Sequence, residues 1–180
     1  MKIVQPIRDK NKIEEIKSIL RRQSGRNYFL FAFGINTGLR ISDILPLKVK
    51  DVRDQEYVIL TEQKTGKIKR FKINYDLKRI IDEYTSGLKQ DELLFPSGRT
   101  KKPISRIHAY RILNDAAELA NLSEIGTHTL RKTFGYHFYQ KTRDTALLQE
   151  LFNHATPAVT LRYIGINQDN MDKAIEDFSL

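Results

Sequence analysis

The amino-acid sequence predicts a mainly helical fold with one small antiparallel β-sheet. Apolar residues recur at helical spacing along most of the chain, and a single pair of strand-like runs flanks a tight turn. Of the 180 residues, 40% are hydrophobic and 29% are charged, as in ordinary globular proteins. This length suffices for one domain with a sizeable core or for two small ones. We expect residues 1–180 to form a single domain.

Two helices are expected near the start of the chain. Residues 9–23 place their apolar side chains on one helical stripe, and Asp9 is suited to cap the first turn. Residues 26–38 are apolar on nearly every side, which indicates a buried helix that Gly38 can end in the left-handed conformation. A short helical segment follows, and Pro46 closes it.

The two strand-like runs, 56–62 and 67–73, predict a β-hairpin because the turn sequence Q-K-T-G lies between them. Residues 48–53 are the candidate for a third short strand. Another amphipathic helix is expected at 75–87, where apolar residues again recur at helical spacing.

The remainder of the chain is expected to be helical. Pro103 suits the first position of a helix, whereas Thr127 and Thr156 suit the capping positions of two others. The expected helices are Pro103 to about Asn121, 127–142, 145–153, a short helix ending near Tyr163, and an amphipathic tail helix at 167–180. The buried stripe expected for helix 127–142 consists of Leu130, Phe134, His137 and Phe138.

The net charge of +9 favours a polyanionic partner, either nucleic acid or an anionic membrane surface. The chain contains no cysteine, which excludes disulfides and cysteine-based zinc sites. The most apolar run, residues 28–35, is too short to span a bilayer, and the first residues lack a signal-peptide pattern. We therefore expect a cytoplasmic protein that binds nucleic acid and has no membrane association.

The candidate site is centred on residues 127–163. His128 and Arg131 lie one turn apart in the first turn of a predicted helix, where free N–H groups already favour an anion. His154 adds another phosphate-binding group, and Tyr163 supplies a hydroxyl that could attack phosphorus. Taken singly, each is also compatible with a plain structural role, since short H-x-x-R patterns recur by chance. The histidine spacing does not match a zinc site, so we expect no metal.

Two earlier segments supply further candidates. Arg40 follows the end of a buried helix and could present its planar guanidinium to a phosphate, with Asp43 as its ion-pair partner; alternatively it is a surface charge. Lys64 lies at the tip of the hairpin. The lysines there either keep an exposed edge soluble or form a basic finger that enters a DNA groove.

Other basic residues are candidates for contacts to a nucleic-acid backbone. They lie on the hairpin, on the loop before Pro103 and on the polar face of the helix that follows. They are Lys67, Lys102, Arg106 and Arg111. Composition does not distinguish a phosphate-tracking strip from a plain solvated surface.

Five stretches, taken in order, resemble the catalytic domain of the tyrosine recombinases, the phage-integrase family. They are T-G-L-R-I-S-D-I-L with Arg40 and Asp43, Q-K-T-G-K with Lys64, H-T-L-R-K-T-F with His128 and Arg131, L-F-N-H-A-T with His154, and T-L-R-Y with Tyr163. The resemblance covers about residues 10–165 and implies the mostly helical fold shared with type IB topoisomerases. Asn153 stands where the family commonly has glycine.

The resemblance also implies a reaction. The enzyme would be a site-specific DNA recombinase that cleaves and rejoins DNA strands through a 3′-phosphotyrosine, for integration, excision or inversion, without a cofactor. The implied roles are Tyr163 as nucleophile, Arg40, Arg131 and His154 as ligands of the phosphoryl oxygens, Lys64 as the acid for the leaving oxygen, and His128 as a proton-transfer group.

The family further implies double-stranded DNA as the partner, with a homo-tetramer on DNA and a monomer or weak dimer without it. The DNA-binding domain that usually precedes the catalytic domain is expected to be absent. The chain would then be either a fragment or a minimal recombinase similar to the fimbrial-switch invertases. Two other functions remain open: a type IB topoisomerase-like relaxing enzyme, and a non-catalytic DNA-binding regulator on the same fold.

Overall fold

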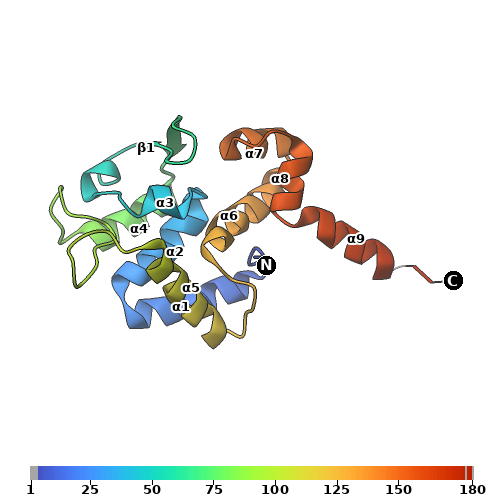
Figure 1. Cartoon of the computed structure of the whole chain (residues 1–180), viewed down its shortest axis with the longest axis horizontal. Helices are drawn as coiled ribbons and strands as arrows, with labels where there is room; N and C mark the ends of the chain where they lie inside the picture. Colours follow the sequence, from blue (N-terminus) through green and yellow to red (C-terminus); the bar gives the residue numbers. More distant parts are fainter. Residues whose placement is uncertain (1–3, 177, 180) are drawn as a thin grey trace.

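The computed structural model describes residues 4–176 and 178–179. The chain as far as α5 forms a helical layer (Figure 1), and most of its buried side chains belong to one large core. Its helices are α1 (Lys10–Gln23), α2 (Gly25–Thr37), the short α3 (Ile41–Ile44), α4 (Tyr75–Thr85) and α5 (Arg106–Leu119). The fully buried rings of Phe29, Phe33 and Phe95 lie at the centre of this core, and Tyr84 stacks on Phe29.

Local signals in the sequence define the ends of α1 and α2 as predicted. The Asp9 side chain accepts a hydrogen bond from the N–H of Asn11 at the start of α1. Gly38 ends α2 with a φ of +62°. A Cβ at Gly38 would also lie 2.4 Å from a ring atom of Phe134 on α6 (Thr127–Thr142), so glycine is required there for close packing as well.

The sheet consists of two antiparallel strands, β1 (Tyr57–Thr61) and β2 (Ile68–Lys72), paired from Tyr57 with Lys72 to Thr61 with Ile68. The third strand considered for residues 48–53 was a wrong prediction. Residues 49–51 form a 3-10 helix instead, because the Asp51 carboxylate accepts a hydrogen bond from the Lys48 N–H at 2.8 Å and closes a tight turn.

Two predicted helix starts also need correction. Helix α5 begins at Arg106 and not at Pro103, because the Ser105 hydroxyl accepts a hydrogen bond from the His108 N–H. Pro103 instead forms an isolated bridge with Pro96. Helix α6 includes Thr127 as its first residue, and Gly126 occupies the capping position.

The chain from α6 onward builds a smaller core. Its helices are α6, α7 (Thr145–Phe152), α8 (Pro157–Tyr163) and α9 (Ile166–Glu176). A Cβ at Gly135 would lie 2.7 Å from Phe152 and from Ile164, so α6 packs tightly on this core. On another face α6 packs against α2, where Leu130 contacts Gly34.

This double contact explains why the predicted buried stripe of α6 is only partly correct. Leu130 is buried, but the other three predicted members, Phe134, His137 and Phe138, are only half-buried. Because two cores cover different faces of the helix, its remaining buried positions do not follow a single stripe. They are Thr129, Arg131, Thr133 and Gly135.

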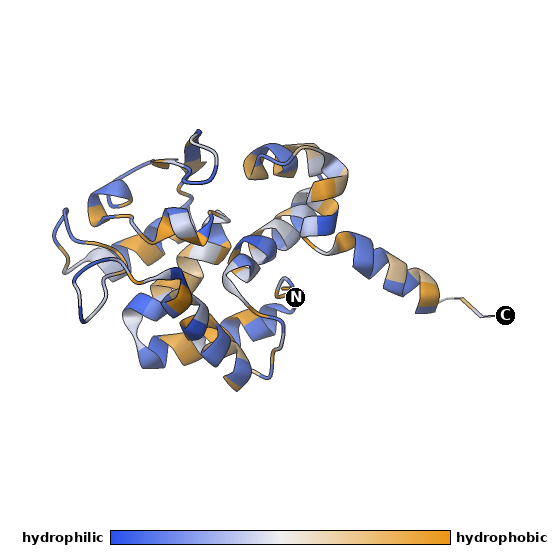
Figure 2. Ribbon diagram, in the orientation of Figure 1, coloured by the Kyte–Doolittle hydropathy of each residue, from blue (hydrophilic) through white to orange (hydrophobic). Residues whose placement is uncertain are grey.

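The tail helix α9 extends away from the rest of the molecule (Figure 1). Its first turns are held by Arg8, whose Nη2 and Nε donate to the Asp169 carboxylate at 2.6 and 3.0 Å. Farther along, Met171, Ile175 and Phe178 are 52%, 70% and 68% exposed. Apolar segments are visible along α9 in Figure 2. The predicted tail helix at 167–180 therefore exists as far as Glu176, while residues 177 and 180 lie outside the described part.

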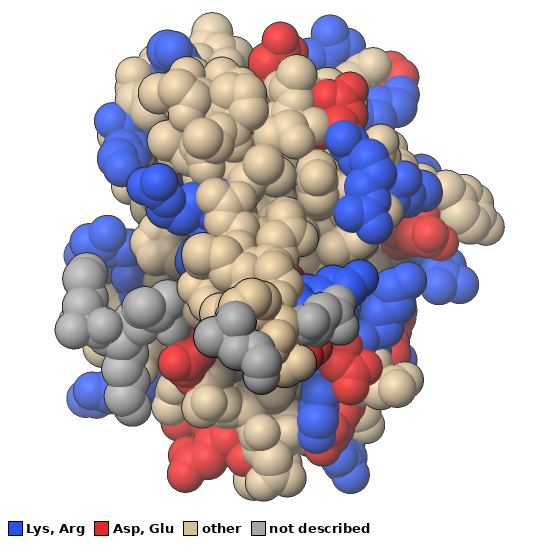
Figure 3. Space-filling model, turned by 90° about the vertical axis from the view of Figure 1, so that its right-hand side faces the viewer, with Lys and Arg blue, Asp and Glu red and all other residues tan. Residues whose placement is uncertain are grey.

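The face from which α9 projects has a distinct surface. Figure 3 shows an uncharged strip across this face, with lysines and arginines on both sides. None of the helices formed by the described residues has the length and apolarity needed to cross a lipid bilayer.

Candidate active site

Residues that are distant in the sequence meet in one open cavity at the N-terminus of α6. The cavity has a volume of about 400 Å³ and is formed by the segment leading into α3, the hairpin turn and the first turns of α5 and α6. Five of the predicted site and DNA-binding residues line it: Arg40, Lys64, Arg106, His128 and Arg131. Of the other two predicted catalytic residues, Tyr163 on α8 adjoins His128, and His154, which follows α7, packs against Tyr163.

Arg131 is almost completely buried, with an exposed fraction of 3%. Its Nη1 donates to the carbonyl of Gly38 at 2.7 Å, and its Nη2 donates to the carbonyl of Phe152 at 2.9 Å. Both carbonyls lie at helix C-termini, where unpaired carbonyls and the helix dipole favour a cation. Burial lowers the pKa of Arg131 to about 10, so the guanidinium stays charged at neutral pH. The structure thus holds a rigid positive charge beside the cavity.

Arg40 pairs with Glu62 and not with Asp43, the partner expected from the sequence. Arg40 Nη1 lies 2.5 Å from Glu62 Oε1, and Glu62 is only 2% exposed. The Asp43 carboxylate instead accepts a hydrogen bond from the main-chain N–H of Gln63 at 2.9 Å. The prediction was wrong because the hairpin brings a second carboxylate to Arg40 from a distant part of the chain. Asp43 holds the turn residue next to Lys64.

The hairpin is attached to the C-terminal end of α7, beside which it lies in Figure 1. The Lys69 ammonium donates to the carbonyl of Leu151, and Lys67 Nζ lies 3.2 Å from Asn153 Oδ1. Asn153 adopts the left-handed conformation expected of a helix end, with a φ of +52°. Lys64, at the exposed turn, makes no hydrogen bond or ion pair with any residue in the described part of the chain. Its ammonium is therefore available to the cavity.

Tyr163 lies at the end of α8, as predicted, with its hydroxyl 3.4 Å from His128 Nδ1. Burial raises the pKa of Tyr163, although the cations of Arg131 and Arg40 act in the opposite direction. Burial lowers the pKa of His128, and the cations of Lys132, Arg131, Lys64 and Arg40 add to this effect. A neutral imidazole thus faces a protonated tyrosine, which is the arrangement needed for proton transfer from the hydroxyl.

His154 follows Asn153 and packs edge-on against Tyr163, with 5.1 Å between the ring centroids. Its Nδ1 lies 3.1 Å from the buried Thr160 hydroxyl. Burial lowers the pKa of His154 to about 4, and the cations of Arg131, Arg40 and Lys64 contribute. His154 is therefore neutral at physiological pH, and when Nδ1 accepts from Thr160 its Nε2–H is free to donate to an anion.

The low pKa of His154 should make the free energy of unfolding depend on pH. An unfolded histidine titrates near pH ~6.5, so between pH 6.5 and 4 the unfolded state binds more protons. The free energy of unfolding should therefore decrease as the pH falls from 7 to 5. After allowance for solvent exposure we expect His154 to contribute about 1 kcal/mol, or roughly 2–4 °C in Tm.

Thermal unfolding of wild type and His154→Gln at pH 7 and pH 5 measures this contribution. The acid-induced loss of Tm should be smaller in His154→Gln. His108→Gln, which changes an exposed histidine on α5, serves as the matched control and should keep the wild-type response. Equal losses in wild type and His154→Gln would contradict the assignment of a depressed pKa to His154.

Three residues at the candidate site were not predicted from the sequence. Glu62 stands directly before the hairpin turn, Lys69 points inward from β2, and Lys132 Nζ lies 5.1 Å from the centre of the Tyr163 ring. The sequence contained only weak signals for them: Glu62 is an acidic residue among the many cations of the hairpin, and Lys132 directly follows Arg131. Burial, which only the fold defines, distinguishes Glu62 and Lys69 from other surface charges.

The predicted DNA-binding residues are all exposed, but only Arg106 lines the cavity. Lys67 reaches Asn153, while Lys102 and Arg111 are absent from the cavity lining. Among the residues that the structure describes, no three His, Asp or Glu side chains gather as a metal site would require.

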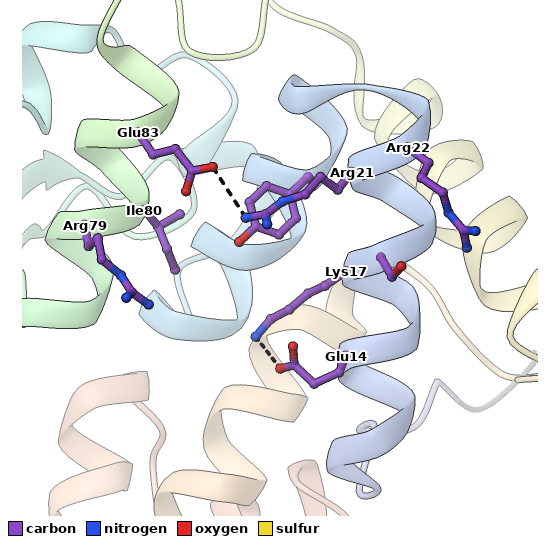
Figure 4. Close-up of a pocket in the computed structure, with 9 residues that line it drawn as sticks. Glu14, Lys17, Arg21, Arg22, Arg79, Ile80 and Glu83 are labelled. Carbon is purple, nitrogen blue, oxygen red and sulfur yellow. Dashed lines mark hydrogen bonds and ion pairs between the residues drawn. The ribbon is translucent and has the colours of Figure 1, made fainter.

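A second and larger pocket lies between α1, α2 and α4, with a volume of about 790 Å³ (Figure 4). Two of its cations have acidic partners: Lys17 pairs with Glu14, and Arg21 pairs with Glu83 while stacking on Tyr28. The other two, Arg22 and Arg79, form no ion pair with the described residues. None of the residues predicted for the site lines this pocket. The predicted catalytic residues thus gather at the cavity beside α6 and not at this pocket.

Solved structures with the same fold include a recombinase named XerA, with a TM-score of 0.75 and 17% identity over 98% of this chain and 65% of that chain. Another is a lambda integrase tetramer bound to a Holliday junction, with a TM-score of 0.71 and 19% identity over 91% of this chain and 49% of that chain. This chain therefore spans about half to two thirds of those proteins. The predicted fold class is confirmed.

Sequence comparison identifies closer relatives. A probable integrase/recombinase of Bacillus subtilis strain 168, YoeC, is 57% identical over 178 residues, which cover 99% of this chain and 98% of the relative. The type 1 fimbriae regulatory protein FimE of Escherichia coli K12 is 29% identical over 79% of this chain and 75% of its own length. The sequence profile of the phage integrase family matches residues 8–170. The chain belongs to the phage integrase family.

Proposed function

We propose that this protein is a site-specific recombinase that cleaves and rejoins double-stranded DNA through a covalent 3′-phosphotyrosine at Tyr163. The observation that carries the proposal is the position of the Tyr163 hydroxyl, 3.4 Å from His128 Nδ1 and beside a cavity lined by Arg40 and Arg131. A nucleophile, a proton acceptor and fixed positive charges therefore meet at one place. A protein that only bound DNA would need the charges but not the tyrosine.

In the cleavage step, Tyr163 Oη attacks the scissile phosphorus. The new O–P bond forms as the bond from phosphorus to the 5′-oxygen breaks. The phenol proton passes to His128, and Lys64 donates a proton to the departing 5′-oxygen, so charge and atoms balance. Rejoining is the reverse reaction, with a 5′-hydroxyl of the same or of a second strand as the attacking group. The phosphotyrosyl bond conserves the energy, so no nucleotide cofactor is needed.

Arg40 and Arg131 stabilise the negative charge that develops on the non-bridging phosphoryl oxygens. Arg131 is already fixed by two carbonyls, and Arg40 by Glu62, so neither guanidinium must be ordered during the reaction. In the tautomer that carries its proton on Nε2, neutral His154 donates a further hydrogen bond to these oxygens. This preorganised positive charge replaces the role that a metal ion plays in other phosphodiester-cleaving enzymes.

Covalent trapping tests the proposed function. Wild-type protein is incubated with DNA that flanks its own gene, the mixture is denatured with detergent, and DNA-linked protein is sought on a gel. We expect an adduct whose peptide map places the DNA on Tyr163. Salt-sensitive binding of the same DNA without any adduct would favour a non-catalytic regulator. Relaxation of supercoiled plasmid without strand exchange would favour a topoisomerase-like enzyme.

We further propose that the protein acts as a homo-tetramer assembled on two DNA duplexes, because exchange of strands requires four cleavages. The tail helix α9 supports this proposal, since Met171, Ile175 and Phe178 leave an apolar stripe exposed on one copy. Docking of α9 on a neighbouring copy would remove this stripe from water.

Changing Ile175 to Glu should disrupt assembly while leaving the single chain folded, because this side chain is 70% exposed. We expect the Tm to stay within about 2 °C and the tetrameric complex with DNA to be lost in analytical ultracentrifugation. Asn170→Glu adds the same charge at another exposed position of α9 and should still assemble. If Ile175→Glu assembles like Asn170→Glu, the apolar stripe is not the contact between copies.

A further inference from the structure

Glu62 is a buried carboxylate that contacts no reacting atom in the proposed mechanism. It is the residue between β1 and the hairpin turn, and its exposed fraction is 2%. Its two oxygens have different partners: Oε1 accepts from Arg40 Nη1 at 2.5 Å, and Oε2 accepts from the Thr65 hydroxyl at 2.7 Å. Burying a charged carboxylate costs desolvation free energy even when it has two polar partners, so the position of Glu62 calls for an explanation.

The contact with Arg40 determines how its guanidinium is presented. Arg40 offers five donors in a planar fork, and Glu62 takes Nη1. Within the described residues, Nη2 and Nε of Arg40 donate no other hydrogen bond, and Arg40 lines the cavity. Glu62 therefore leaves the remaining edge of the fork available to a phosphate while restricting its rotation.

Glu62 also closes the turn that carries Lys64. Its N–H donates to the carbonyl of Lys67 at 2.9 Å, and its carbonyl accepts from the N–H of Gly66 at 2.8 Å. Together with the Thr65 hydroxyl, these contacts fix the turn relative to Arg40. One residue thus connects two groups that the mechanism assigns to different oxygens of the scissile phosphate, Arg40 to the non-bridging oxygens and Lys64 to the departing 5′-oxygen.

The charge balance of the site supports an ionised Glu62. Burial alone would raise the pKa of this carboxyl, but the Thr65 hydroxyl and the cations of Arg40, Lys69 and Arg131 outweigh burial and lower it. Without the negative charge of Glu62, Arg40 and Arg131 would repel each other across a poorly solvated region.

We infer that Glu62 is a positioning residue, which aims the guanidinium of Arg40 at the phosphoryl oxygens and ties it to the turn that carries Lys64. This inference rests on the proposed function, because it assigns a role within the same strand-cleavage site. Glu62 itself contacts no reacting atom.

The test compares wild type with Glu62→Gln, which keeps the size of the side chain and removes its charge. Glu56→Gln is the matched control, because Glu56 pairs with Lys72 on the same hairpin but is exposed. Single-turnover rates of adduct formation are measured with saturating DNA, so that differences in binding do not enter. Each protein is assayed on normal DNA and on DNA with a methylphosphonate at the scissile position, which lacks the negative charge that Arg40 would stabilise.

On normal DNA we expect Glu62→Gln to be about 10–100-fold slower than wild type, as for other residues that orient a functional group, and Glu56→Gln to be unchanged. On methylphosphonate DNA the difference between Glu62→Gln and wild type should shrink to within about threefold. Equal losses on both substrates would overturn the inference, because they would indicate general disruption. The ratio of the rates on normal and methylphosphonate DNA is measured within each protein, so it does not depend on the folded fraction.

A second measurement uses an Arg40→Ala background. If Glu62 acts through Arg40, adding Glu62→Gln should cause no further loss on normal DNA. A further tenfold loss would overturn the inference. If wild type forms the adduct and Glu62→Gln forms it at the same rate, the role of Glu62 is overturned while the proposed function stands. Absence of any adduct from wild type would overturn the proposed function itself, and this inference with it.

Discussion

Tyr163→Phe should form no covalent adduct with DNA under conditions in which wild type does. Phenylalanine keeps the ring that packs against His154 and Phe152, at centroid distances of 5.1 and 5.7 Å, but it lacks the attacking oxygen. The loss should be complete within detection, because among the described residues no other hydroxyl is hydrogen-bonded to the His128 ring. Detergent-resistant DNA–protein species on a denaturing gel provide the measurement.

The same variant should bind DNA and fold normally. The hydrogen bond of the Tyr163 hydroxyl to His128 is long, at 3.4 Å, so its removal should cost less than about 1 kcal/mol of stability. Tyr139→Phe, on the neighbouring helix α6 and also half-buried, is the matched control and should form the adduct. An adduct of normal yield from Tyr163→Phe would contradict the assignment of the nucleophile.

Arg131→Lys should be at least about a hundredfold slower in cleavage although it preserves the positive charge. The two hydrogen bonds of Arg131 go to Gly38 and Phe152, carbonyls on different helices, and a guanidinium reaches both because its donors lie in a fixed plane. A lysine ammonium has no such fork and cannot reproduce both contacts and the position of the charge. Single-turnover adduct formation provides the rate.

Arg131→Lys should also destabilise the fold by about 2 kcal/mol, because one buried carbonyl loses its donor. Chemical denaturation measures this change. Arg162→Lys, at an exposed position on α8, is the control and should change neither rate nor stability. A rate close to wild type for Arg131→Lys would show that the charge alone suffices and that the fork geometry is unnecessary.

Local signals explain which elements were predictable. The ends of α1, α2 and α8 depend on residues adjacent in sequence, such as Asp9, Gly38 and Thr156, and these were predicted correctly. The 3-10 helix at 49–51 was not predicted. The residues there look strand-like, but the Asp51 carboxylate accepts a hydrogen bond from the Lys48 N–H and closes a turn instead. The start of α5 was likewise decided by Ser105 capping and not by the proline.

The order of short motifs predicted the six catalytic candidates. No single motif predicted that these residues would lie close together in space. Arg40, Lys64 and His128 belong to three segments that are separated by more than twenty residues each, and packing of α2, the hairpin and α6 brings them to one cavity. The partner of Arg40 shows the limit most clearly. Asp43 was the nearer carboxylate in sequence, whereas Glu62 is the nearer one in space.

The sequence by itself determined the residue types of the site, the helical character of the chain and its positive charge, because motifs, caps and composition are properties of local sequence. Only the tertiary structure decided which charges are buried, which carbonyls hold Arg131 and which face of α9 is left exposed. The physical reason is that burial, pKa and the direction of a side chain depend on neighbours contributed by distant segments, and those neighbours exist only once the helices have packed.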